Sequence, residues 1–239
     1  SGAVRVFDFG HSELKFLADF GFGGLFLFGS ILGVVMTAQL FFAEIDNRTA
    51  LTLLAKPLSR AEFLAGKFLG IWAVLGVFVL VLAALLAAML GWRAAELAQL
   101  AAERRLAPPE CDLAGLALYA ALQWLRLGVV VAMVLAVAAA ARTFLFAVVV
   151  GALAVLAGQL QWLSQELLLK PAEPGLGHAA LWLLTHLLPN LQQFNLGDAL
   201  VLAPHQVTAG TLPWVFLSGV AYVVAFLVLA TFLFRRREI

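Results

Sequence analysis

The chain of 239 residues is 64% hydrophobic and only 12% charged, and its mean hydropathy is +1.01. Such an apolar composition excludes an ordinary soluble domain, and a net charge of +1 offers no basic surface large enough for nucleic-acid binding. Long uncharged runs recur along the chain, and roughly 20 apolar helical residues are enough to cross a bilayer core. We therefore expect an all-α polytopic membrane protein.

Five stretches are apolar enough to form membrane-spanning helices, and we expect them to make up a single transmembrane domain over residues 1–239. The predicted spans are approximately 18–43, 66–92, 115–141, 143–165 and 212–234. In the first, Gly29 and Gly33 have the G-x-x-x-G spacing that permits close helix approach. Glycine is also simply common in membrane helices, so this spacing has two explanations.

Arg126 interrupts the third stretch. The part after it, 127–141, would be about 22 Å long as a helix, which is too short to cross a membrane, so we expect the helix to begin before Arg126. The arginine either lines a substrate path, because a charge within a membrane usually faces a cavity or a partner, or snorkels to the interface. The candidate path residues are Gln123, Arg126, Gln159 and Gln161.

A charged loop, residues 44–65, separates the first two spans. Within it, Lys56-Pro57 is expected to end any preceding helix, because proline lacks an amide hydrogen and disfavours α geometry in the residue before it. Ser59 and Glu62 then fit the S-x-x-E capping box that begins a helix. Two helices therefore meet the water here, joined by a short amphipathic segment.

Three further polar segments, 1–17, 93–114 and 166–211, are expected on the opposite side of the membrane. Residues 93–112 are predicted to form a short surface helix that ends in a turn at Pro108-Pro109.

The stretch 174–197 is uncharged but too rich in histidine, asparagine and glutamine to span hydrocarbon. We expect an amphipathic helix lying in the interface, with Trp182 and the leucines toward lipid. His178 and His186 could share one face of that helix and hold a metal, but interfacial histidines are the commoner case. No metal site is predicted.

The positive-inside rule sets the orientation. With the charged loop, Arg142 and Arg235–Arg237 in the cytoplasm, the cytoplasmic segments hold eight basic and four acidic residues, whereas the other side holds six basic and ten acidic ones. The C-terminus is then cytoplasmic and the Ser1 end external. Because the first residues lack the apolar core of a signal peptide, we expect one more span upstream and six in the complete protein.

Catalytic motifs are absent from the sequence. It contains no G-x-x-x-x-G-K-[ST] phosphate loop, so we do not expect the chain to hydrolyse nucleotide. It also lacks the histidine spacings of metal sites and the G-x-S-x-G pattern of hydrolases. We predict no catalytic residue, metal or cofactor in this chain, and an intramembrane enzyme is disfavoured because no paired acids or histidines occur within the spans.

Residues 44–67 read E-I-D-N-R-T-A-L-T-L-L-A-K-P-L-S-R-A-E-F-L-A-G-K. They resemble the cytoplasmic loop of type-2 ABC transporter permeases, with the pattern E-x-x-x-x-T-x-x-x-L-L-x-K-P-x-S-R-x-x-F-x-x-G-K. The L-P-N-L-Q-Q-F-N-L of 188–196 is similar to that group's external motif, and the F-R-R-R-E of 234–238 is similar to its C-terminal ending. Order and spacing agree along nearly the whole chain.

The resemblance implies a transport subunit and not an enzyme. Such permeases pair with a second permease copy and are driven by a separate ATP-binding subunit, which holds ATP and Mg²⁺. In them the loop between the second and third spans carries a coupling helix that docks on the ATPase, and a second, smaller contact lies at a later turn. With one more span expected upstream, that loop corresponds to the charged loop between the first two spans predicted here. The coupling residues implied here are Glu44, Asp46, Arg48, Thr49, Lys56, Pro57, Ser59, Arg60 and Arg142.

Two functions stay open on the sequence. One is ATP-driven export across the bacterial cytoplasmic membrane, where the scarcity of charge in the spans favours lipid-like or amphipathic cargo over a small ion. The other is a non-transporting scaffold or mechanotransmission subunit that acts on an external protein partner through residues 177–198. For the charged loop itself, the plain alternative to a coupling helix is a solvated loop that only sets topology.

Overall fold

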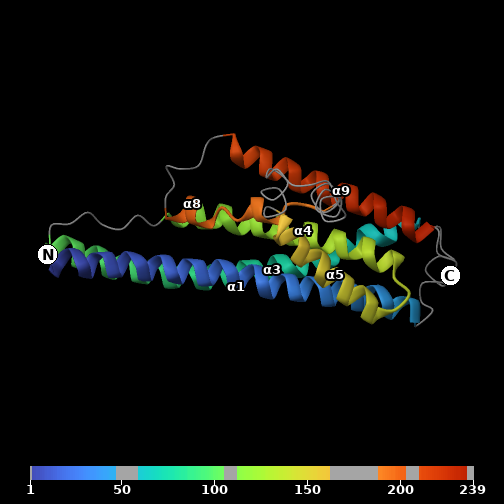
Figure 1. The fold of residues 1–239 in the computed structure, drawn as a ribbon, viewed down its shortest axis with the longest axis horizontal. Helices are drawn as coiled ribbons and strands as arrows, with labels where there is room; N and C mark the ends of the chain where they lie inside the picture. The colour runs from blue at the N-terminus through green and yellow to red at the C-terminus, as the bar shows by residue number, and fades with distance from the viewer. Residues whose placement is uncertain (1, 47–58, 105–111, 162–187, 203–209, 236–239) are drawn as a thin grey trace, which may run out of the picture.

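The computed structural model describes residues 2–46, 59–104, 112–161, 188–202 and 210–235, and these are helical with no strand among them. The elements are α1 (Gly2–Asp46), α3 (Arg60–Arg104), α4 (Leu113–Ala140), α5 (Phe144–Gln159), the 3₁₀ helix η1 (Leu191–Phe194), α8 (Gly197–Val201) and α9 (Thr211–Arg235). Figure 1 shows α1 and α3 side by side along the longest axis, with α4 between them and α9.

Four of the described helices, α1, α3, α4 and α9, are long and apolar enough to cross a membrane. Each coincides with one of the predicted spans to within one residue or contains it, and the all-α polytopic membrane fold is confirmed. The remaining predicted span, 143–165, begins as α5, whose 16 residues make about 24 Å of helix. That helix ends in a bend at Leu160, and residues 162–165 lie outside the described part of the chain.

Helices α1 and α3 are each 45 residues long, or about 68 Å at 1.5 Å per residue. This is more than twice the roughly 30 Å thickness of a bilayer core. The separate surface helix expected at 93–112 is wrong as far as Arg104, because α3 continues through this segment unbroken. Its alanines, leucines and glutamates are strong helix formers, and Leu97 and Ala101 are buried.

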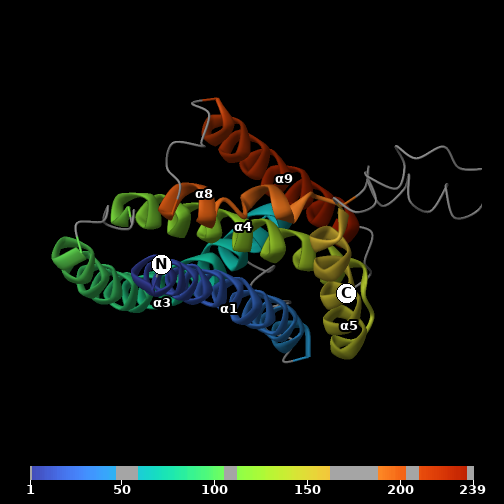
Figure 2. The same ribbon diagram turned by 60° about the vertical axis from the view of Figure 1, so that its left-hand side comes forward.

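Helix α4 lies at the centre of the bundle, in contact with α1, α3, α5, η1, α8 and α9 (Figure 2). Its residues 125–136 are all buried. Glycine, alanine and valine predominate there, so apart from Arg126 the helix is apolar on every side, which is the pattern of a fully enclosed helix. By contrast, α3 and α9 expose many large apolar side chains, such as Leu80 and Phe216, as expected for lipid-facing helices.

The segment 188–202 is folded into the bundle. Leu191, Phe194 and Val201 are fully buried, and the segment forms η1 and α8 instead of one helix lying flat in the interface. The predicted interfacial helix is therefore wrong for its described end. Polar residues that argued against hydrocarbon, such as Gln192 and Gln193, form hydrogen bonds inside the protein. Trp182, His178 and His186 lie outside the described residues.

Trp72 of α3 and Trp124 of α4 form a reciprocal clasp. Trp72 Nε1 donates a hydrogen bond to the Trp124 carbonyl oxygen at 2.9 Å, and Trp124 Nε1 donates to the Trp72 carbonyl oxygen at 2.8 Å. The rings stack with centroids 4.3 Å apart. Gly76 and Gly128 follow the tryptophans by one turn, and a Cβ on either would lie within 3.0 Å of the opposite indole nitrogen. Two W-x-x-x-G sequences therefore provide both the clasp and its space.

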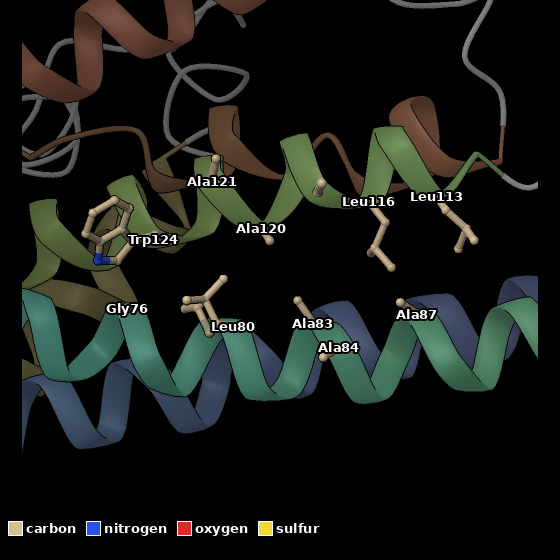
Figure 3. A pocket seen from close by; sticks show the side chains of 12 residues that line it. Gly76, Leu80, Ala83, Ala84, Ala87, Leu113, Leu116, Ala120, Ala121 and Trp124 are labelled. Atoms are coloured by element: carbon tan, nitrogen blue, oxygen red, sulfur yellow. The ribbon is translucent and has the colours of Figure 1, made fainter.

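Beside this clasp, α3 and α4 enclose an apolar groove of about 420 Å³. Figure 3 shows it extending from Gly76 and Trp124 to Ala87 and Leu113, with alanines from both helices along its walls. The groove stays open because the small alanine side chains do not fill the space between the two helices.

We predict that Gly76→Ala lowers the free energy of unfolding by about 1–3 kcal/mol, because the new methyl group displaces the hydrogen-bonded Trp124 ring. Gly70→Ala, on the same helix with nothing within 4 Å of its Cβ, is the matched control and should be neutral or stabilising by up to about 1 kcal/mol. Thermal unfolding in detergent, with near-ultraviolet circular dichroism of the stacked indoles, measures both. Equal stability of the two variants would contradict the clasp.

Candidate functional site

The charged loop leads into α3 through a capping box. The Ser59 amide donates to Glu62 Oε2 at 2.7 Å, and the Glu62 amide donates to Ser59 Oγ at 3.2 Å. Both amides would otherwise be without partners at the beginning of a helix. The predicted cap is confirmed, and it fixes the first residue of α3 at Arg60.

Arg60 caps the end of another helix. Its NH1 group donates to the carbonyl oxygens of Phe234 at 2.9 Å and Arg235 at 3.0 Å, and the guanidinium lies 5.7 Å from the centre of the Phe234 ring. These carbonyls end α9, where the helix dipole favours a positive charge. Figure 1 shows this end of α9 beside the beginning of α3. Arg60 therefore attaches α3 to α9.

Lys67, two turns further along α3, attaches it to α1. Its Nζ lies 2.7 Å from Glu44 Oε1 and donates to the Leu40 carbonyl oxygen at 2.6 Å. The lysine side chain is only 10% exposed, and its charge lies 5.3 Å from the Phe63 ring centre. Shielding from water strengthens such a pair relative to an exposed one. We call Glu44, Arg60 and Lys67, with the helix ends they join, the helix-end junction.

The structure brings some of the predicted coupling residues together. Glu44, Ser59 and Arg60 belong to the junction or its cap, whereas Arg142 is exposed in the turn between α4 and α5. The side chain of Asp46, and all of Arg48, Thr49, Lys56 and Pro57, lie outside what the structure describes. Sequence reasoning gave Lys67 no role of its own, although the G-K at the end of the motif was the available signal.

Arg126 is buried at the centre of the bundle, with 1% of its surface exposed. Its NH1 donates to Gln123 Oε1 at 3.2 Å, and its NH2 donates to Gln159 Oε1. The guanidinium carbon lies 3.5 Å from the centre of the Phe26 ring, a cation–π contact. A side chain so enclosed does not snorkel, and that interpretation is wrong.

Glutamine side chains extend this network to the L-P-N-L segment. Gln159 Nε2 donates to Gln192 Oε1 at 2.8 Å, and Gln123 Nε2 donates to the Phe194 carbonyl oxygen at 3.1 Å. On the other side of η1, Gln193 Nε2 donates to Ser218 Oγ at 3.1 Å. Hydrogen bonds therefore join η1 to α4, α5 and α9. Gln161, the fourth candidate path residue, is also buried, at 3% exposed.

A polar cavity of about 180 Å³ adjoins Arg126. It is bounded by α1, α4, α5 and the η1–α8 segment, and its lining residues are Asp19, Phe22, Gly23, Phe26, Arg126, Gln159, Asn195 and Asp198. Burial raises the pKa of the Asp198 carboxyl, and the hydrogen bond and charge of Asp19 raise it further, whereas Lys15, 3.9 Å away, opposes this shift. A basic and an acidic wall thus share one cavity.

Several residues at this site were not singled out from the sequence. Gln192, Asn195 and Asp198 follow Pro189 within ten residues, and that density of polar side chains beside a buried 3₁₀ helix was the available signal. Asp19 lies on α1, and nothing local marks it as a neighbour of Asp198.

Comparison with known proteins gives one family match. A family model described as "ABC-2 family transporter protein" matches residues 4–239. The match includes the helix-end junction, Arg126 and the L-P-N-L segment. No curated protein matches the chain.

We predict that Arg60→Gln lowers the free energy of unfolding by about 1–2 kcal/mol, because the last carbonyls of α9 lose a charged donor. Arg142→Gln removes the same charge from an exposed turn and should leave stability within about 0.5 kcal/mol. Chemical unfolding followed by circular dichroism compares the two variants. Equal losses would show that the cap contributes nothing.

A second prediction concerns Gln159. Replacement by leucine leaves Arg126 NH2 and Gln192 Oε1 without their partner. We expect the free energy of unfolding to fall by about 1–3 kcal/mol. Gln159→Glu keeps an acceptor for Arg126, and the Gln192 amide can turn to donate to it, so its stability should be retained. Hydrogen exchange at 191–194 should speed up in the leucine variant only. Unchanged exchange there would refute the link to η1.

Proposed function

The chain belongs to the ABC-2 family of transporter proteins, and on that basis we propose that it is the permease subunit of an ATP-driven ABC transporter. A separate ATP-binding subunit, which holds ATP and Mg²⁺, would drive export of a substrate across the bacterial cytoplasmic membrane. The observation that carries this proposal is the helix-end junction. It joins α1, α3 and α9 at the end of the bundle where the charged loop of the motif enters α3.

The junction suits the transmission of force. A movement of the first turns of α3 is passed to α9 through Arg60 and to α1 through Lys67, so three helices respond as one body. Because Glu44 and Arg60 are engaged inside the chain, we assign them to transmission and not to direct ATPase contact. Arg142 and residues 46–57 of the charged loop, including Arg48 and Lys56, are the residues we propose for that contact.

We propose that the translocation path runs beside α4. Arg126 is a buried charge in the central helix, and Gln123 and Gln159 surround it. Buried ionisable groups of membrane proteins commonly mark substrate pathways. Gln161 would extend the path beyond the end of α5.

The exposed apolar faces of α3 and α9 are available to partners within the membrane. We propose that a second permease copy covers part of them and that lipid covers the rest. The apolar groove between α3 and α4 (Figure 3) has no charged residue in its lining, which suits a lipid chain. With the charged loop facing the ATPase, the end of α9 is cytoplasmic and the beginning of α1 is external.

Mechanotransmission to an external protein is the second candidate function. The specific observation in its favour is the length of α1 and α3, which continue well beyond one membrane thickness. A movement that begins at the helix-end junction would be transmitted along α1 and α3 to a partner bound to these extensions.

To test the coupling contact, Arg142→Glu should reduce ATP-coupled activity of the reconstituted complex by at least about tenfold, because reversing an interfacial charge costs several kcal/mol. Stability should be unaffected, since the side chain is exposed. Glu103→Arg, an exposed reversal near the other end of α3, is the control and should be fully active. The measurement is ATPase rate and substrate movement in proteoliposomes.

Arg48→Glu tests the proposed contact between the charged loop and the ATPase with the same measurements. If both reversals keep normal coupling, or if no ATPase co-purifies with the chain, the permease proposal fails. Movement of an external partner without substrate transport would instead favour mechanotransmission.

A further inference from the structure

The polar cavity beside Arg126 is lined by groups of opposite charge that come from different helices. Arg126 lies on the central helix, and Asp19 and Asp198 come from α1 and α8. Asp198 is 52% exposed, so the cavity opens to solvent at α8, whereas Arg126 is 1% exposed at its inner end. A ligand entering past the carboxyls would therefore meet the guanidinium last.

The arginine is incompletely satisfied by the protein. Its two bonded partners are neutral glutamine oxygens, and among the residues that the structure describes its Nε has no hydrogen-bond partner. A buried guanidinium without an anion carries a large desolvation cost. An anionic group in the cavity would offset that cost and accept from the free donor.

The acidic wall argues against a simple anion. Asp19 and Asp198 line the cavity and Lys15 lies 3.9 Å from Asp198, so the formal charges of these three groups sum to one negative charge. With Arg126 the cavity is then nearly neutral but strongly polarised. A lone phosphate would be repelled at the entrance and a lone amine at the inner end, whereas a group with both charges matches each wall.

We propose that this cavity binds a zwitterionic group, with its anionic end at Arg126 and its ammonium end between Asp19 and Asp198. Phe22 also lines the cavity, and aromatic rings favour ammonium groups, whereas Phe26 is already in contact with the Arg126 guanidinium. The inference rests on the proposed transport function and names the substrate class for that path. A cavity of about 180 Å³ admits a small polar group and not an acyl chain, so the source is a lipid headgroup or a free solute of the same chemistry.

Gly23 offers a way to fill the cavity without disturbing the bundle. It lines the cavity, and a Cβ there would have nothing within 4 Å. Its neighbour Gly24 also has nothing within 4 Å of a Cβ but does not line the cavity. Gly23→Leu and Gly24→Leu are therefore a matched pair: each adds the same side chain to the same helix, and only the first occupies the cavity.

The test is calorimetric titration of O-phosphoethanolamine into the full chain, with any subunit that co-purifies, in phosphatidylglycerol nanodiscs. We expect saturable binding that is at least about tenfold tighter than that of inorganic phosphate or ethanolamine alone. Gly23→Leu should weaken it at least about tenfold, and Gly24→Leu less than about twofold. Both variants should unfold at the same temperature, which excludes a folding defect.

Nanodiscs of phosphatidylethanolamine distinguish the two sources. If the natural ligand is a headgroup, the lipid competes and the free probe binds about tenfold more weakly there; if it is a free solute, the two discs give equal affinities. Absence of saturable binding, equal affinity for phosphate alone, or equal effects of the two leucine variants would overturn the inference. Coupling through Arg142 is measured separately, so loss of binding with normal ATP coupling removes only the substrate class.

Discussion

The burial of one positive charge in the most enclosed helix is the constraint on which much of the architecture depends. Arg126 is almost fully shielded from water, so amide oxygens from α4 and α5 take the place of water at its guanidinium. Gln159 then donates a hydrogen bond to Gln192 of η1, and Gln123 donates one to the Phe194 carbonyl oxygen. A polar segment that would be unstable in lipid is stable here because its partners are already in place, and its return into the bundle creates the wall of the polar cavity.

Hydrogen bonds to helix ends organise the other end of the molecule. Arg60 donates to the last carbonyls of α9, whereas Lys67 pairs with Glu44 and donates to the Leu40 carbonyl, six residues before the end of α1. The bonds of Arg60 depend on where α9 ends, and those of Lys67 hold α3 against the last two turns of α1. The S-R and G-K of the loop motif therefore have an internal structural role, whereas Arg142 is exposed.

Features that depend on local sequence were predictable, and features that depend on distant contacts were not. Hydropathy located the long helices, and the S-x-x-E pattern located the capped start of α3, because both signals lie within the element they describe. The acceptors for Arg60 are 174 and 175 residues away, and Gln192 is 33 residues from Gln159. No local pattern reveals these pairs. For the described residues 188–197, the flat interfacial helix was wrong for the same reason: the polar residues were judged against hydrocarbon, but their surroundings are glutamine, serine and backbone.

The length of α1 and α3 has a geometric consequence. When a straight helix of about 68 Å is held at one end, a small change in its angle moves the other end over a much larger distance. A tilt of about 5° at the helix-end junction would displace the far end by about 6 Å, close to the pitch of one helical turn. Leu14 and Leu97, near the far ends of α1 and α3, belong to one buried cluster, so the pair would swing together. Tilts too small to disturb the packing around α4 would then move the far ends of α1 and α3 by about 6 Å on the opposite side of the membrane.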